Sequence, residues 1–237
     1  MTLWEAAILG VVQGVTEFLP VSSSGHLVVF QHFLTTIHDA VAFDLVLHIG
    51  TLLPVLWVYR TDLWSIVTDL WLSITQKGDM PLFERSGIRL FGLLIVGSIP
   101  TALIGLCFQD YFEALFHNMR MVGFAFGVTA AVLFCIRFAP DSKRGLREFS
   151  WKHAVLIGLV QGLAITPGIS RSGSTIAIAL FLGLKRDLAA RFSFMLSIED
   201  SRKFKAKSTT LLKATLSPVS DSRQPLINPK RVEKYSS

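Results

Sequence analysis

Residues 10–25 read GVVQGVTEFLPVSSSG and residues 158–173 read GLVQGLAITPGISRSG, and the two stretches align without a gap at an offset of 148. Identical residues fall at paired positions, which include Gly10/Gly158, Gln13/Gln161, Gly14/Gly162, Ser22/Ser170, Ser24/Ser172 and Gly25/Gly173. Each stretch is an apolar run followed by a turn rich in proline, serine and glycine. An internal repeat of this kind predicts that one structural unit, a helical hairpin, is built twice.

The composition places these hairpins in a membrane protein. Of the 237 residues, 51% are hydrophobic and only 17% are charged, whereas soluble domains average about 25% charged residues. Between the two repeats lie three apolar stretches near the length needed to cross a bilayer, at about residues 41–59, 88–108 and 119–138. We therefore expect an all-α integral membrane protein.

The net charge of +6 does not indicate a nucleic-acid partner. Residues 199–237 alone hold nine Lys and Arg against four Asp and Glu, so this segment supplies +5 and the rest is close to neutral. A nucleic-acid footprint needs a basic stripe on a folded face. The segment is polar and contains three prolines, and we predict that it is disordered.

The loop charges predict how the chain crosses the membrane. Lys and Arg concentrate in cytoplasmic loops, and they occur in residues 60–89 and 137–152 but not in residues 31–40 or 109–118. Basic residues flank both ends of the apolar segment 153–184. Both ends of this segment therefore lie inside, which predicts a hairpin that enters the membrane and returns.

Three spans between two hairpins make the second hairpin enter from the side opposite the first. This is an inverted-topology repeat, in which substrates bind near the midplane where broken helices converge. The second repeat is expected to be truncated, because the chain turns polar at Glu199. The expected organisation is a membrane domain over 1–198, with re-entrant hairpins at 1–30 and 153–184, a partial span at 187–198, and a polar tail at 199–237.

The first hairpin carries acid–base groups. Glu17 lies in an apolar helix with Gln13 one turn earlier on the same face. An intramembrane carboxylate normally faces a cavity or a partner, although a structural hydrogen bond is the alternative. The turn that follows supplies hydroxyl, backbone N–H and imidazole groups from Ser22, Ser23, Ser24, Gly25 and His26. Serine also caps helices, so this turn is specific only in combination with the rest.

The second hairpin carries the cation. Arg171 sits in the glycine-rich turn Pro167–Thr175, where a new apolar helix begins. An arginine fork and a helix N-terminus both bind phosphate oxygens, whereas an arginine at the membrane edge is the alternative. Candidate ligands beside it are Ser170, Ser172, Gly173 and Thr175. Glycines Gly10, Gly14, Gly158 and Gly162 are expected to pack helices together.

Together the turns hold what phosphoryl transfer requires, namely donors for phosphate oxygens, a nucleophile and an acid or base. Glu17 is also a candidate ligand for Mg²⁺ or Ca²⁺, because hard divalent cations prefer carboxylate and phosphate oxygens. No dedicated metal-binding motif is visible in the sequence.

The stretches QGVTEFLPVSSSGH (residues 13–26) and PGISRSGST (residues 167–175) resemble the two signatures of the bacitracin-resistance type of undecaprenyl-diphosphatase. The resemblance covers residues 1 to about 198. It implies hydrolysis of undecaprenyl diphosphate to the monophosphate carrier lipid, which is reused in peptidoglycan synthesis, by a multi-pass protein of the bacterial inner membrane with a periplasmic site.

The resemblance also implies roles for single residues. Glu17 matches the essential carboxylate and Arg171 the phosphate clamp. Ser23 matches a proposed nucleophile or phosphate ligand, and His26 an acid–base group or alternative nucleophile. Gln13 stands where many members have a second glutamate.

Two other functions stay open at this stage. An inverted repeat with broken helices is also transporter architecture, so a carrier of lipid phosphates or anions is one alternative. A non-catalytic, truncated product of a diphosphatase gene is the other. A homodimer is left open as well.

Overall fold

The computed structural model describes residues 2–34, 40–75, 85–140 and 143–198. Across these residues the regular elements are α-helices, and an isolated β-bridge joins Arg144 to Leu184. The predicted all-α fold class is therefore confirmed. The tail at 199–237 and residues 35–39 of the expected loop at 31–40 lie outside the described residues, so the prediction of a disordered tail stays a prediction.

The N-terminal hairpin consists of α1 (Leu3–Phe18) and α2 (Ser23–Leu34). A capping box starts α1, since the Glu5 N–H donates to the Thr2 hydroxyl over 3.3 Å and the Thr2 N–H donates to the Glu5 carboxylate over 2.7 Å. The helix ends at Phe18, because Leu19 is extended and Pro20 follows it. The turn between the helices is four residues long, so their ends stay close.

The C-terminal hairpin consists of α8 (Trp151–Leu163) and α9 (Arg171–Phe181). Ser150 and His153 form a capping box at the start of α8. After α9 the chain turns at Gly183 and forms a last described helix over residues 186–198. Helix α8 begins two residues before the segment 153–184 that the sequence marked out, and the last helix begins one residue before the segment 187–198.

Three longer helices occupy the expected spans, namely α3 (Ala40–Val58), α5 (Ser86–Cys107) and α7 (Met119–Ile136). Among the described residues, α5 and α7 are long and apolar enough to cross a membrane, and α3 contributes the shorter apolar stretch Val46–Val58. Much of the apolar surface of these helices is exposed, as lipid contact requires. The intervening loops hold two helices that the sequence did not predict, α4 (Arg60–Thr75) and α6 (Gln109–Phe116).

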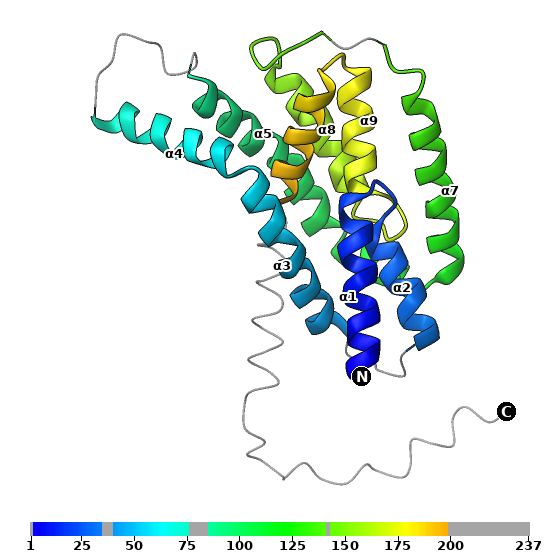
Figure 1. The fold of residues 1–237 in the computed structure, drawn as a ribbon. Coiled ribbons are helices and arrows are strands. Elements are labelled where there is room, and N and C mark those ends of the chain that lie inside the picture. The colour runs from blue at the N-terminus through cyan, green and yellow to red at the C-terminus, as the bar shows by residue number, and fades with distance from the viewer. Residues whose placement is uncertain (1, 35–39, 76–84, 141–142, 199–237) are drawn as a thin grey trace, which may run out of the picture.

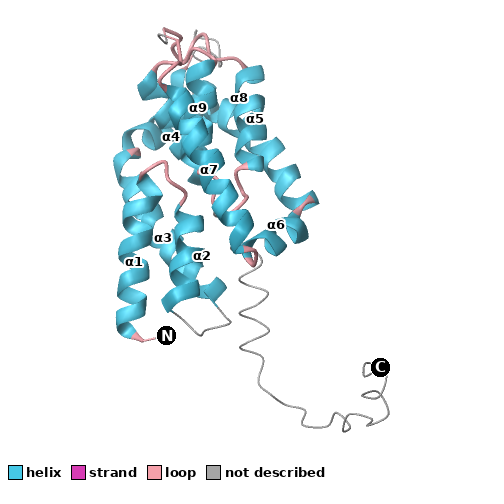
Figure 2. Ribbon diagram, turned by 90° about the vertical axis from the view of Figure 1, so that its right-hand side faces the viewer, coloured by secondary structure: helices cyan, strands magenta, loops and turns pink. Residues whose placement is uncertain are grey.

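The two hairpins approach each other from opposite ends of the molecule. Figure 1 shows α1 and α2 in the lower half and α8 and α9 in the upper half, with both turns near mid-height. The perpendicular view in Figure 2 gives the same arrangement, and α7 runs past both hairpins. Helix α7 contacts both α2 and α9.

The densest packing lies between α5 and α8. A Cβ at Gly158 would clash with the carbonyl oxygen of Gly97, so the backbones touch, and the Thr101 hydroxyl donates across to the Gly158 carbonyl over 2.8 Å. Gly162 packs against the side chain of Ile104. In the first repeat, Gly10 lies in ordinary contact with the Leu47 side chain of α3, whereas Gly14 has no neighbour within 4 Å of a Cβ position, so the expected helix packing is wrong at Gly14.

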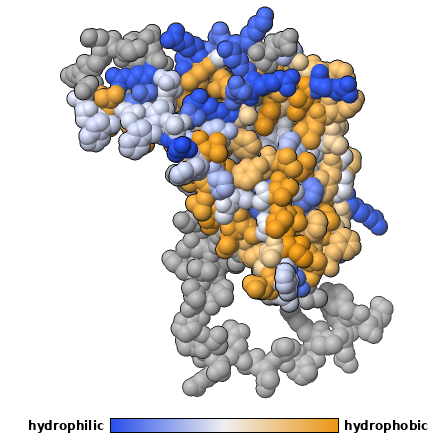
Figure 3. Space-filling model, viewed as in Figure 1, coloured by the Kyte–Doolittle hydropathy of each residue, from blue (hydrophilic) through white to orange (hydrophobic). Residues whose placement is uncertain are grey.

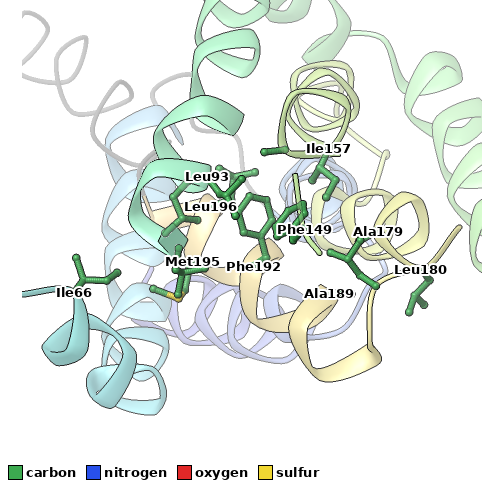
Figure 4. Close-up of a cluster of buried hydrophobic side chains, with 14 residues drawn as sticks. Ile66, Leu93, Phe149, Ile157, Ala179, Leu180, Ala189, Phe192, Met195 and Leu196 are labelled. Atoms are coloured by element: carbon green, nitrogen blue, oxygen red, sulfur yellow. The ribbon is translucent and has the colours of Figure 1, made fainter. Parts of the chain in front are cut away.

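A hydrophobic core extends from this contact to the last described helix. In Figure 4, Phe149 and Phe192 lie at its centre, with ring centroids 4.7 Å apart in an edge-to-face arrangement. Ile157 of α8 and Leu196 are fully buried beside them. Figure 3 shows hydrophilic side chains gathered at the upper end, above a body with a largely apolar surface. This distribution is typical of a protein embedded in a membrane with one polar end outside it.

Replacing Gly158 by alanine is expected to lower the free energy of unfolding by about 1–3 kcal/mol, because the new methyl group overpacks the contact with Gly97. Gly14→Ala is the matched control, and it should be neutral or stabilise by up to about 1 kcal/mol. Thermal unfolding in detergent measures both changes. Equal stability of the two variants would contradict the close α5–α8 contact.

Candidate active site at the contact between the two turns

The last turn of α1 and the first residue of α2 bring three polar side chains together. Gln13 is fully buried, and its amide nitrogen donates to the Glu17 carboxylate over 2.9 Å. The Ser23 hydroxyl donates to the same carboxylate oxygen. Sequence spacing predicted the first contact, whereas the second depends on the shape of the turn.

That shape is set by Ser22, which has a φ of 67°. A residue other than glycine rarely adopts this left-handed conformation, and such residues cluster at functional sites. The Ser22 hydroxyl accepts from the Gly25 N–H over 3.4 Å, which holds the first turn of α2. It also lies 3.5 Å from the Ser24 hydroxyl. The reversal at Ser22 places Ser23 against Glu17.

His26 lies one turn into α2. Its Nδ1 is 2.8 Å from the Ser22 carbonyl oxygen. Because a carbonyl can only accept, Nδ1 carries the proton, and Nε2 of the neutral ring is left as the acceptor. The ring also meets the edge of Phe126 on α7, with centroids 4.9 Å apart. These contacts orient His26 without joining it directly to Glu17.

The second turn starts α9 in a similar way. Ser170 is the N-cap, and its buried hydroxyl accepts from the Gly173 N–H over 3.1 Å. This is the same hydrogen bond that Ser22 makes in the first repeat. Arg171 is the first residue of α9, the position that Ser23 holds in α2. Its side chain is partly exposed, as is that of Ser172.

The two turns lie in direct contact. A Cβ at Gly25 would be 2.7 Å from the Cα and 2.9 Å from the nitrogen of Gly168. A Cβ at Gly173 would be 3.1 Å from the Pro20 carbonyl oxygen. The glycines therefore let the backbones meet, and the N-termini of α2 and α9 converge on one region.

Thr175 sits differently from the other candidate ligands. Its side chain is fully buried, and its hydroxyl donates to the Arg171 carbonyl over 2.9 Å and to the Ser172 carbonyl over 3.2 Å. The hydroxyl is thus used within α9 and supports its first turn. Sequence reasoning missed two neighbours on α7, Phe126 and Thr129, because residues of these types are ordinary in an apolar helix.

The site offers few protein ligands for a metal ion. No group of three or more His, Cys, Asp or Glu side chains that could hold a metal occurs among the described residues. One feature does fit a hard cation: the Gln13 amide oxygen is buried beside Glu17 and accepts no hydrogen bond. An amide and a carboxylate oxygen suit a cation whose remaining ligands come from water and phosphate.

Comparison with known proteins agrees with this geometry. The sequence matches the family described as "Bacitracin resistance protein BacA" over residues 6–218. The chain belongs to the BacA family. It is 45% identical over 206 residues to the undecaprenyl-diphosphatase of Alkaliphilus metalliredigens, covering 84% of this chain and 73% of that protein.

Other undecaprenyl-diphosphatases show similar identity. That of Desulfosudis oleivorans is 46% identical over 198 residues, covering 82% of this chain and 72% of that protein. That of Methanosphaera stadtmanae is 43% identical over 204 residues, covering 84% and 74%. The BacA-family match includes both turns and extends past residue 198, where the resemblance was expected to end.

Gly25→Ala is expected to push the two turns apart, because two of the three atoms nearest the new methyl group belong to the Gly168 backbone. Hydrogen–deuterium exchange should rise in peptides covering residues 164–175. Gly123→Ala on α7 is the matched control, since a Cβ there meets nothing within 4 Å. Unchanged exchange in a folded Gly25→Ala variant would show that the turns do not depend on this contact.

Proposed function

We propose that this protein hydrolyses undecaprenyl diphosphate to undecaprenyl phosphate and phosphate, the activity for which its BacA relatives are named. The observation that carries the proposal is the Ser23–Glu17 hydrogen bond beside the N-terminus that begins with Arg171. A hydroxyl held by a carboxylate is the arrangement of an activated nucleophile. An arginine at a helix N-terminus is a phosphate site.

The geometry supports a distinct task for each turn. Arg171 and the N–H groups of α9 bind the phosphates and stabilise the charge that builds up on the transferred group. The Ser23 oxygen attacks the terminal phosphorus while its proton passes to Glu17. The bond between that phosphorus and the bridging oxygen breaks, which releases undecaprenyl phosphate.

Water then completes the reaction by attacking the phosphoserine, which releases phosphate and restores the Ser23 hydroxyl. The Nε2 atom of His26 can accept or return a proton in this step, because its Nδ1 is committed to the Ser22 carbonyl. Gln13 orients Glu17 through the amide hydrogen bond. Ser22, Ser24 and Gly25 shape the first turn, and Ser170, Ser172, Gly173 and Thr175 shape the second.

We also place both hairpins within a cell membrane, as re-entrant halves of an inverted-topology repeat. The turns meet at mid-height of the molecule, and the segment that joins α7 to α8 lies at the end opposite the N-terminus (Figure 1). This segment and the first turn of α8 carry exposed basic side chains, among them Arg147 and Lys152. By the positive-inside rule that end is cytoplasmic. The α1–α2 hairpin then enters from the periplasmic face, where the lipid substrate would reach the site.

Removal of the proposed base should abolish turnover. Glu17→Gln keeps the size of the side chain but cannot take the Ser23 proton, so the rate of phosphate release should fall by about 10²–10⁴-fold. The assay uses undecaprenyl diphosphate in detergent micelles. Glu113→Gln, in the exposed helix α6, is the control and should keep full activity. Substrate transfer across vesicles without phosphate release would contradict the enzyme and favour a transporter.

A divalent cation, when bound, would neutralise diphosphate charge, and Glu17 and Gln13 are the residues that fit it. Chelation should therefore stop phosphate release, and Mg²⁺ or Ca²⁺ should restore it. Gln13→Leu removes the buried amide oxygen and should raise the cation concentration for half-maximal activity by about 10-fold or more. Gln109→Leu, on the exposed side of α6, is the matched control. Full activity in excess chelator would exclude the cation.

A further inference from the structure

Thr129 stands out among the polar residues of α7 because its hydroxyl bonds outside its own helix. The side chain is buried, and its oxygen accepts from the Ser170 N–H over 2.9 Å and donates to the Gly168 carbonyl over 2.8 Å. Buried threonine hydroxyls in helices more often return to the carbonyl three or four residues earlier, as at Thr51 and Thr175. The Thr129 hydroxyl instead links α7 to the second turn.

These two hydrogen bonds enclose the residues that precede Arg171. Gly168 has a φ of 93°, so the backbone at this point is not helical and is not held by the hydrogen bonds of a helix. Its polar backbone groups need partners, because an unpaired group at this depth is strongly disfavoured. Thr129 satisfies one acceptor and one donor at once. It thereby fixes where Ser170 caps α9 and where Arg171 begins it.

The same face of α7 also touches the first turn. Val122, Ala125, Phe126 and Thr129 follow helical spacing along one face. The Val122 carbonyl and the Ala125 methyl group lie against Gly168, within 2.8 Å of a Cβ position there. Phe126 contacts the His26 ring and lies against Gly25. Helix α7 therefore has side chains that meet both turns at their contact.

We propose that Thr129 is a positioning residue, which holds the second turn so that Arg171 meets the phosphates while Ser23 faces the terminal phosphorus. The inference rests on the proposed role of Arg171. Both hydrogen bonds of the Thr129 hydroxyl go to the backbone of the second turn, so Thr129 acts through that backbone. A residue away from the reacting atoms can still matter, because misplacing the reacting groups by about 1 Å can lower the reaction rate by about 100-fold.

The test compares Thr129→Val, which keeps the shape and removes the hydroxyl, with Thr129→Ser, which keeps the hydroxyl. Thr101→Val is the matched control, because Thr101 is equally buried and its hydroxyl also crosses between helices, but at the α5–α8 contact. For phosphate release from undecaprenyl diphosphate, Thr129→Val should lower kcat/KM by about 10–100-fold, mainly through KM. Thr129→Ser should stay within about threefold of the parent.

Thr101→Val should leave KM unchanged even where it lowers the Tm as much as Thr129→Val does. Equal losses of activity in the two valine variants, in proportion to the folded fraction, would assign Thr129 a purely structural role and overturn the proposal. A folded Thr129→Val variant that keeps the parental KM would also overturn the proposal.

A double-mutant cycle separates this inference from the proposed function. If Thr129 acts through Arg171, Thr129→Val should have little further effect in an Arg171→Ala background. Independent, multiplicative effects of the two substitutions would overturn the positioning role while leaving the Arg171 clamp intact. Full activity of Arg171→Ala alone would instead refute the proposed clamp, and the inference with it.

Discussion

The contact of Gly25 with Gly168 is the constraint on which the rest of the site depends. It places the N-termini of α2 and α9 side by side, and each N-terminus carries a partial positive charge. Two positive helix ends repel each other, and Arg171 adds a full charge to one of them. An anion between the helix ends relieves this repulsion. The packing of two glycines thus creates a region that favours a phosphate group before any side chain is considered.

The repeat divides the chemistry between two equivalent frameworks. At the offset of 148, Ser23 corresponds to Arg171, Glu17 to Ile165 and His26 to Ser174. The capping serines make the same hydrogen bond in both turns, so the backbone pattern is shared. Ile165 lies against Gly105 of α5, an apolar contact that a carboxylate could not make without losing its solvation. One half therefore keeps the acid–base groups, and the other supplies the cation.

Much of this site could be predicted from the sequence, because spacing along a helix determines which side chains share a face. The Gln13–Glu17 hydrogen bond follows from that rule. The Ser23–Glu17 contact does not, since it requires the left-handed conformation of Ser22. Thr129 could not be distinguished from other hydroxyl residues in apolar helices, because its role depends on which turn lies beside it. Likewise, Gly10 and Gly158 occupy equivalent positions, yet only Gly158 faces a neighbouring backbone.

The polarity of the two turns supports the proposal that Ser23 is the nucleophile. A diphosphate offers only acceptors, so it is drawn to the donors of the second turn, Arg171 and the α9 N–H groups. The first turn presents acceptors, the Glu17 carboxylate and the unpaired Gln13 oxygen, which repel phosphate unless a proton or a cation lies between them. The Ser23 hydroxyl provides such a proton, since it donates to Glu17. Its oxygen lone pairs are then left to approach the phosphorus, and transfer of that proton to Glu17 strengthens the attack as it proceeds.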